Sequence, residues 1–400
     1  MDKIRRPAYF QFKGNDMSTQ QVCAIKLRNH HFGNEWFDRV EDRWNYVDFL
    51  ANVNWRKNWI SFDGTVYCAE TDRVYCGITS FDADIFKAYD RKQKRFVDLG
   101  FSRAANSYDA KFHRAMAPTK DGKTIYTATA LLHDIDRYRD APGGGIFMYD
   151  IATEQIKKLG IPIPHDYIQS IVLDEKRDVI YCAHFTPEYF SIFDLQTRQT
   201  RNVGLLGNGF AMAQGENIIL DDEGCAWSGW AATRAWQENC GADSHRLCKY
   251  DPSAERIIFY DRGLPRKDGA RGTAKLEGLF NFGTGCLYAS GDNGSLYRID
   301  TRSGQAVYLG TPIRKNRSRL ASMVKHPDGY AYGIVGRDGH CRLLRFDPRN
   351  DNYEVGDMVI DEEGIAMWQC HDITCTPDGV LYAGENDNPY RSSYLWEIKI

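Results

Sequence analysis

Short apolar runs alternate with polar turns along most of the chain, and many of the runs end in the same way. An aromatic or aliphatic residue followed by an acidic residue closes a run roughly every 50 residues. These marks are Tyr89-Asp90, Tyr149-Asp150, Phe193-Asp194, Tyr250-Asp251, Ile299-Asp300, Phe346-Asp347 and Trp396-Glu397. A period of this length with four short strands is typical of a propeller blade. The pattern predicts an all-β chain folded as a seven-bladed β-propeller.

The two ends of the chain predict how the ring closes. The sequence stops after what looks like a third strand, Tyr394–Ile400, so the last blade lacks its outer strand. Pairing with an N-terminal strand would supply it and remove exposed sheet edges, with Ala8–Phe12 or Gln21–Leu27 as the candidates. We therefore expect residues 1–400 to form one propeller domain, with the closing strand and an irregular segment in 1–60 and the blades in 61–400. Within 1–60, residues 29–59 are expected to form a loop or a partial helix packed on the ring.

One hairpin brings two histidines into a predicted pair. Residues 111–138 read as two strands joined by a turn at Asp121-Gly122, with His113 at the start of the first strand and His133 at the end of the second. Antiparallel pairing returns the second strand to the starting edge. We expect both imidazoles at one rim of the ring.

The same reasoning extends to every blade, because inner-strand starts and second-strand ends line the mouth of the axial channel. The residues at these positions are His113, Arg114, His133, His165, Tyr167, Gln169, His184, Trp227, Trp230, Lys275, Glu277, Asp292, Arg319, Arg337, His340, Trp368, Gln369, His371, Glu385 and Asp387.

The histidines in this set allow three interpretations. They can form an acid–base site, with His113, His133 and His184 near the substrate and Tyr167 as proton donor. Three of them, His113, His184 and His371, can hold a divalent metal such as Mn, Zn or Ca. Alternatively, each is a half-buried strand-end histidine bonded to a carbonyl.

The remaining mouth residues are candidates for substrate binding. Trp227, Trp230 and Trp368 can stack on sugar rings or simply pack in the fold. Polar contacts are expected from Arg114, Gln169, Glu277, Arg319 and Glu385.

Composition narrows the partners. A net charge of −3 and a pI of about 6.4 give no excess of positive charge for binding a polyanion. No apolar run is long enough to span a membrane. We expect neither nucleic acid nor membrane as a partner, and a monomer or homodimer. Eleven cysteines cannot all pair, which favours free thiols and a cytoplasmic location.

Two motif absences in the sequence limit the chemistry. There is no G-x-S-x-G elbow and no dinucleotide-binding fingerprint behind a strand. Covalent catalysis and redox chemistry are therefore poorly supported.

The arrangement of His113, Asp121-Gly122 and His133 resembles the seven-bladed propeller ulvan lyases and the rhamnose–glucuronate lyases and hydrolases. Tyr167 looks like the counterpart of their tyrosine, whereas their arginine has no match at Cys182–Phe185. Intracellular oligogalacturonate lyases, propellers with an axial histidine metal site, are a second resemblance. These similarities imply a lyase that cleaves uronic-acid oligosaccharides by β-elimination.

Two alternatives stay open at this point. A glycoside hydrolase would need two carboxylates, for which Glu277 and Glu385 are the candidates. A non-catalytic propeller that binds a partner or ligand would need no reactive set at all.

Overall fold

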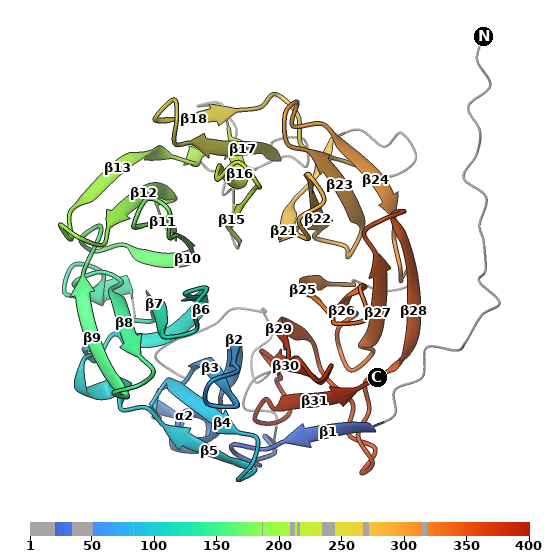
Figure 1. Ribbon diagram of the computed structural model, residues 1–400. Coiled ribbons are helices and arrows are strands. Elements are labelled where there is room, and N and C mark those ends of the chain that lie inside the picture. Colours follow the sequence, from blue (N-terminus) through green and yellow to red (C-terminus); the bar gives the residue numbers. More distant parts are fainter. Residues whose placement is uncertain are drawn as a thin grey trace.

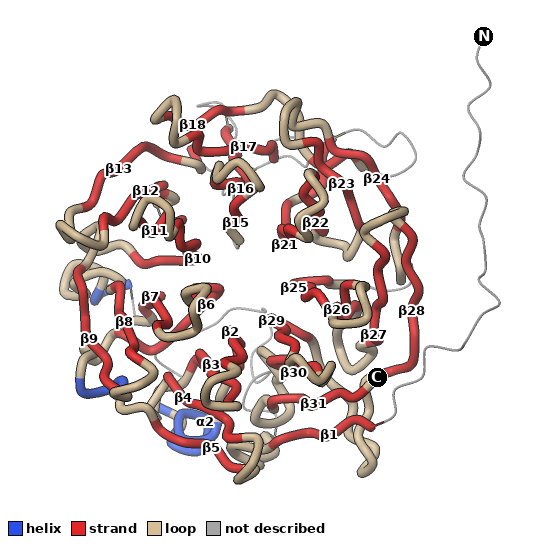
Figure 2. The backbone as a smooth tube through the Cα atoms, in the orientation of Figure 1, coloured by secondary structure: helices blue, strands red, loops and turns tan. Residues whose placement is uncertain are grey.

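The strands stand in groups around a central axis, and one strand of each group lies nearest that axis (Figure 1). This is a computed structural model, and it describes residues 21–33, 51–82, 84–133, 135–185, 187–208, 213, 217–233, 245–266, 272–313 and 318–400. In this part of the chain, helix is limited to α2 (Val53–Asn58) and the short 3-10 turns η1 (Phe101–Arg103) and η2 (Ile135–Arg137) (Figure 2). The prediction of an all-β propeller is confirmed.

We number the groups blades 1 to 7 in chain order and give the strands of each from the axis outward. Blade 1 holds β2 (Ser61–Cys68), β3 (Arg73–Thr79), β4 (Phe86–Asp90) and β5 (Arg95–Asp98). Blade 2 holds β6 (Asp109–Pro118), β7 (Thr124–Leu131), β8 (Ile146–Asp150) and β9 (Gln155–Gly160). Blade 3 holds β10 (Tyr167–Asp174), β11 (Val179–Phe185), β12 (Tyr189–Asp194) and β13 (Thr200–Leu205).

Blade 4 has the shortest inner strand and some extra pairing. It holds β15 (Ile219–Leu220), β16 (Ala226–Ala232), β17 (His245–Asp251) and β18 (Arg256–Phe259), with β14 (Gly207–Asn208) parallel to β16. A two-stranded ribbon, β19 (Leu264–Pro265) with β20 (Thr273–Ala274), follows it.

The last three blades complete the circuit. Blade 5 holds β21 (Leu276–Asn281), β22 (Cys286–Gly291), β23 (Leu296–Asp300) and β24 (Ala306–Gly310). Blade 6 holds β25 (Leu320–Lys325), β26 (Ala331–Val335), β27 (Arg342–Asp347) and β28 (Asn352–Met358). Blade 7 holds β29 (Cys370–Cys375), β30 (Leu381–Glu385), β31 (Leu395–Lys399) and β1 (Gln21–Ile25).

Blade 7 joins the two ends of the chain. β1 runs antiparallel to β31, from the pair Gln21 and Lys399 to the pair Ile25 and Leu395 (Figure 1). Of the two segments predicted to supply this strand, Gln21–Leu27 contains β1, and Ala8–Phe12 lies outside the described residues. The pairing joins an N-terminal strand to the C-terminal blade, so the backbone groups along β31 are used on both sides.

The acidic marks have a structural explanation at the outer hairpins. The carboxylate of Asp90 accepts the main-chain N–H groups of Lys92 and Gln93, at 3.1 and 2.9 Å. These bonds help hold the pKa of Asp90 below its usual value. The fourth residue after each Asp mark has a positive φ, between 50° for Lys94 and 68° for Gly304. The repeat seen in the sequence is thus a repeated turn that ends the third strand.

Large apolar side chains fill the space between neighbouring blades. Between blades 1 and 2, the ring of Phe86 lies edge-on to Tyr149 at 5.3 Å and to Phe112 at 5.6 Å. All three are buried. Packing of this kind joins one blade to the next.

The segment before blade 1 contributes a short helix. Asn52 caps α2 by accepting the N–H of Trp55 at 3.0 Å, and Trp55 stacks on Trp59 at 5.0 Å, with Phe81 of blade 1 beside both. Residues 29–59 were expected to form a loop or a partial helix, and their described part contains this short helix, whose tryptophans contact Phe81.

The ten described cysteines are all unpaired. No helix within the described ranges has the length and apolar character to cross a membrane.

Candidate functional site: an axial cluster of histidines and arginines

Six of the inner strands carry a β-bulge at an equivalent place. Their pairing with the second strand shifts register after Phe62, Phe112, Ile168, Leu276, Leu320 and Cys370. The polar residues within these shifts are Asp63, His113 with Arg114, Gln169, Glu277, Ser322 and His371. A bulge redirects a side chain relative to a regular strand. Contacts between these residues link different blades, so the bulges build one cluster at the axis.

Two neutral histidines form the first half of this cluster. The rings of His113 and His371 meet edge to face with centroids 4.7 Å apart, and both residues are buried. Nδ1 of His113 lies 2.9 Å from the carbonyl oxygen of Gln169, and Nδ1 of His371 lies 2.7 Å from that of Asp63. A carbonyl only accepts, so each Nδ1 carries the hydrogen and each Nε2 keeps its lone pair.

The electrostatics around the pair keep it uncharged. Burial lowers the pKa of His113 and of His371 well below the ordinary value, and the nearby cations Arg114, Arg319 and Lys111 lower it further. Both rings are in their base form near neutral pH, with cations beside them.

Two arginines and one glutamate form the second half. Oε1 of Glu277 accepts from Nε of Arg319 at 2.6 Å and from Nη2 of Arg114 at 3.2 Å. Nη1 of Arg114 donates to the main-chain oxygen of Glu277 at 2.6 Å, and Arg319 reaches Asn386 at 3.4 Å. Side chains from blades 2, 5, 6 and 7 meet here.

Two carboxylates, Asp63 and Asp372, lie beside these two halves. Asp372 accepts from the main-chain N–H of Thr65 at 2.8 Å and from the hydroxyl of Ser322 at 2.8 Å. Burial raises the pKa of Asp372. Burial likewise raises the pKa of Asp63, which Lys111 partly opposes. Asp372 thus ties β29 to the inner strands of blades 1 and 6, whereas the Asp63 carboxylate accepts from Ser61 and Thr79 within blade 1.

A cavity of about 300 Å³ adjoins the cluster. Arg114, Ser322 and Asp372 line one part of it, together with Asn217. Its apolar wall consists of Ala115, Met116, Ala117, Pro118, Ile171, Val172, Leu173 and Ile218. A second cavity, of about 560 Å³, lies among the turns of blades 1, 2, 6 and 7 and shares Pro118 with the first. The volume beside Arg114 is within the size range of small-molecule sites.

The structure brings together six of the predicted site residues. They are His113, Arg114, Gln169, Glu277, Arg319 and His371.

His184 is placed in a different network, inside blade 3. Its Nε2 lies 2.8 Å from the hydroxyl of Ser191, and its Nδ1 lies 3.6 Å from Oδ2 of Asp166. All three residues are buried. Burial lowers the pKa of His184 to about 3 and raises the pKa of Asp166 to about 7. The described residues hold no grouping of His, Cys, Asp and Glu suited to a metal ion, so the predicted set of His113, His184 and His371 is not brought together.

His133 and Tyr167 each contact other aromatic rings, near strand ends of blades 2 and 3. The ring of His133 lies 6.0 Å from Tyr108 and 6.1 Å from Tyr138. Tyr167 packs edge-on against Phe185 at 5.5 Å, and burial raises its pKa. The predicted pairing of His133 with His113 is not found, because His113 sits within β6 rather than at its start and His133 lies beyond the end of β7.

The tryptophans predicted to bind sugars make packing contacts or hydrogen bonds within the protein. Trp227 is fully buried, stacks on Tyr260 at 5.4 Å and donates its indole N–H to Asp221 at 2.7 Å. The indole of Trp230 donates to the Tyr260 carbonyl at 2.9 Å. Trp368 packs edge-on against Tyr390 at 5.3 Å. Trp227 therefore has no open ring face for a sugar.

Glu385 is likewise structural. Its carboxylate accepts from the main-chain N–H groups of Trp368 and Tyr394, at 2.7 and 2.8 Å, and from Nη1 and Nη2 of Arg391, at 2.7 and 2.8 Å. The residue is fully buried. Substrate binding by Glu385 is thus not supported, because its oxygens already hold a loop of blade 7.

The sequence did not single out several neighbours of the cluster. These are Asp63, Lys111, Ser322, Asp372 and Asn386. A signal for three of them exists: an apolar residue followed by two polar or small ones recurs in the inner strands as Phe62-Asp63-Gly64, Leu320-Ala321-Ser322 and Cys370-His371-Asp372. Aligning these triplets with Phe112-His113-Arg114 would have predicted that Asp63, Ser322 and Asp372 lie at the same height along the axis as His113 and Arg114.

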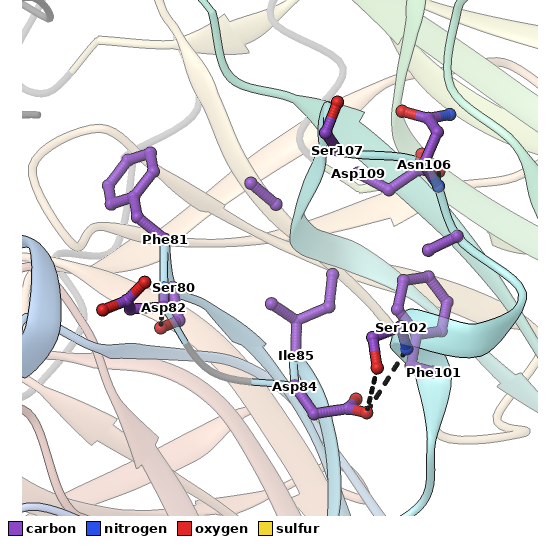
Figure 3. Close-up of a pocket in the computed structure, with 12 residues that line it drawn as sticks. Ser80, Phe81, Asp82, Asp84, Ile85, Phe101, Ser102, Asn106, Ser107 and Asp109 are labelled. Atoms are coloured by element: carbon purple, nitrogen blue, oxygen red, sulfur yellow. Dashed lines mark hydrogen bonds between the residues drawn. The ribbon is translucent and has the colours of Figure 1, made fainter.

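A separate pocket of about 390 Å³ lies between blades 1 and 2 (Figure 3). Asp84 accepts from the N–H and hydroxyl of Ser102, both at 3.3 Å, and Asp109 accepts the N–H of Asn106 at 2.9 Å. These carboxylates fix the loop that connects the two blades, which explains their position without a ligand.

Comparison with known proteins is informative about fold alone. No known protein family matches the chain by sequence, and no curated protein does. The extracellular domain of the putative one component system BT4673 from B. thetaiotaomicron has a TM-score of 0.55 and 12% identity, covering 85% of this chain and 38% of that one. The chain therefore spans less than half the length of that domain.

Two further structures have a similar size. U3-55K gives a TM-score of 0.55 at 10% identity, covering 85% of this chain and 96% of that one. The RRP9 WD40 repeats give 0.56 at 10% identity, covering 85% and 94%. The chain shares the β-propeller class with them.

Proposed function

We propose that this chain is a β-propeller binding module that takes a small ligand through an anionic group at the axial cluster. One observation carries the proposal: Arg114 and Arg319, from two blades, converge on one carboxylate oxygen, and Arg114 also lines the adjoining cavity. Guanidinium groups suit the planar geometry of carboxylates. The structures of similar shape include WD40 repeats and a one-component-system domain, which favours binding over catalysis.

The cavity suggests what the rest of the ligand is like. Asn217 and Ser322 offer polar contacts, and Met116 and Ile171 offer an apolar wall. A uronic acid unit combines a carboxylate with ring hydroxyls and apolar ring faces. Uronic acids are the ligand class proposed first.

Calorimetric titration tests this proposal. Galacturonate should bind and galactose, which lacks the carboxylate, should not. Arg114→Met should abolish the difference. Arg345→Met is the matched control, because Arg345 pairs with Glu354 on outer strands, away from the axis. Equal binding of both sugars, or of neither, would contradict the proposal.

A second candidate function is a lyase acting at the same site, and the neutral state of His113 favours it. His113 keeps a lone pair on Nε2 beside cations that can neutralise a substrate carboxylate. In β-elimination the base would take the proton next to the carboxylate, a carbon–carbon double bond would form, and the neighbouring C–O bond would break. The departing oxygen would then take a proton from water.

The lyase candidate has its own test. Oligogalacturonate incubated with the protein would develop the ultraviolet absorbance of the conjugated product. Reducing ends without that absorbance would indicate hydrolysis. Binding with neither signal would leave the binding module as the function.

A further inference from the structure

Glu277 occupies an unusual position for a buried acid. It stands in the bulge of β21 and is 7% exposed. Its Oε1 accepts from arginines of two other blades, at 2.6 and 3.2 Å. The Arg114–Glu277 pair spans blades 2 and 5, and the Arg319–Glu277 pair spans blades 5 and 6.

A comparison with Glu385 shows how the contacts of Glu277 differ from those of a structural acid. Glu385 also pairs with an arginine, but two main-chain N–H groups and the Asn388 amide donate to it as well, and together they fix a loop within its own blade. Among the described residues, the Glu277 carboxylate is instead contacted by side chains that converge from other blades. An acid that only anchors a loop does not require arginines from two other blades. A site that binds an oxyanion requires cationic side chains that converge on one point.

We infer that Glu277 takes the place of the ligand's anionic group when no ligand is bound and competes with it for Arg114 and Arg319. This inference rests on the proposed function. An incoming carboxylate must displace the Glu277 side chain or share the guanidiniums with it, and like charges at that distance repel. Glu277 would thereby limit affinity and restrict the site to ligands whose oxyanion fits between the two arginines.

Substitution separates competition from a purely structural role. Glu277→Gln keeps the shape and removes the charge, and Glu277→Asp keeps the charge on a shorter side chain. Titration with galacturonate and with inorganic phosphate should show the Gln variant binding one of them at least tenfold more tightly than wild type. The Asp variant should not gain affinity. Preference for galacturonate would assign a carboxylate ligand, and preference for phosphate a phosphorylated one.

Two results would overturn the inference in distinguishable ways. If wild type binds galacturonate with Arg114 dependence and Glu277→Gln binds no better, competition is wrong and the proposed function stands. If neither wild type nor Glu277→Gln binds either oxyanion, the proposed function fails with it.

A second measurement keeps the inference testable if Glu277→Gln does not fold. In a crystal structure of wild type with galacturonate, the 2.6 Å contact between Arg319 Nε and Glu277 Oε1 must open. A ligand bound at Arg114 with that contact unchanged would contradict competition.

Discussion

The described residues include three buried histidines, a pair at the axis and one in blade 3, and these two places differ in what surrounds the rings. At the axis, His113 and His371 face each other across blades 2 and 7, with arginines from blades 2 and 6 and a cavity beside them. In blade 3, His184 lies between Ser191 and Asp166, neighbours in the same blade. Both sets are uncharged because burial lowers their pKa.

Burial and a lowered pKa therefore do not separate a binding site from a structural network. The Asp166–His184–Ser191 set has the residue types of a catalytic triad, yet all its members are buried within one blade. The axial set joins several blades and opens on a cavity. Position in the ring is the feature that distinguishes them, and it can be tested by changing each set alone.

The largest effect is expected for Arg114→Met. Loss of one charge-assisted contact to a carboxylate, about 1.5–3 kcal/mol, should weaken galacturonate binding by roughly ten- to more than a hundredfold. Thermal stability should fall as well, because the Arg114 side chain is 6% exposed and its loss leaves the buried Glu277 carboxylate with one arginine fewer. Affinity is therefore compared at a temperature where the variant is folded. Calorimetry measures the affinity and a melting curve measures the stability. Unchanged affinity for galacturonate would contradict a binding role for the axial cluster.

Ser191→Ala should affect stability instead. It leaves Nε2 of the buried His184 without its 2.8 Å partner, which costs about 1–3 kcal/mol of unfolding free energy. Galacturonate affinity should stay within about twofold of wild type. Ser228→Ala, a buried serine in blade 4, is the control for removing a hydroxyl. A loss of affinity in Ser191→Ala would place the blade 3 network in the site.

Asp166→Asn should reveal a pH dependence confined to blade 3. The pKa of Asp166 is about 7 in the folded protein against 3.8 unfolded, so the folded state binds more protons between these values. Its contribution to stability is complete below pH 3.8 and is lost as pH rises through about 7. Wild type should lose melting temperature relative to the variant from pH 4 to 7. A constant difference would contradict the raised pKa.

Among the substitutions at the axial cluster, a small effect on binding is expected for His113→Gln. A neutral amide can replace a neutral imidazole as a polar neighbour, so galacturonate affinity should fall by less than about fivefold. If the lyase candidate is right, the same variant should lower turnover by roughly two to four orders of magnitude. A loss of turnover much larger than the loss of affinity would therefore indicate catalysis, and two similar small losses would indicate binding alone.

The sequence predicted the ring better than the site. The repeated acidic marks correspond to a turn that the chain builds locally, with Asp90 bonding the N–H groups that follow it. Such local chemistry is readable in sequence. The axial cluster depends on bulges, where register shifts by one or more residues, and spacing alone does not show them.

The two outcomes for histidine illustrate this limit. His113 was expected at a strand start and lies within β6, where the bulge turns it toward His371. His133 was expected beside it and lies past β7 with Tyr108 and Tyr138. Glu277 and Glu385 looked equivalent in sequence. Their contacts in the structure show that Glu277 lies in the axial cluster and that Glu385 anchors a loop.

Side-chain ¹⁵N resonances of the ten histidines, followed during titration with galacturonate, test the central claim most directly. Resonances assigned by substitution to His113 and His371 should shift with galacturonate and stay unchanged with galactose. The His184 resonance should stay in place with both sugars. A shift at His184 without one at His113 and His371, or no shift at any histidine at high galacturonate concentration, would contradict the axial binding site.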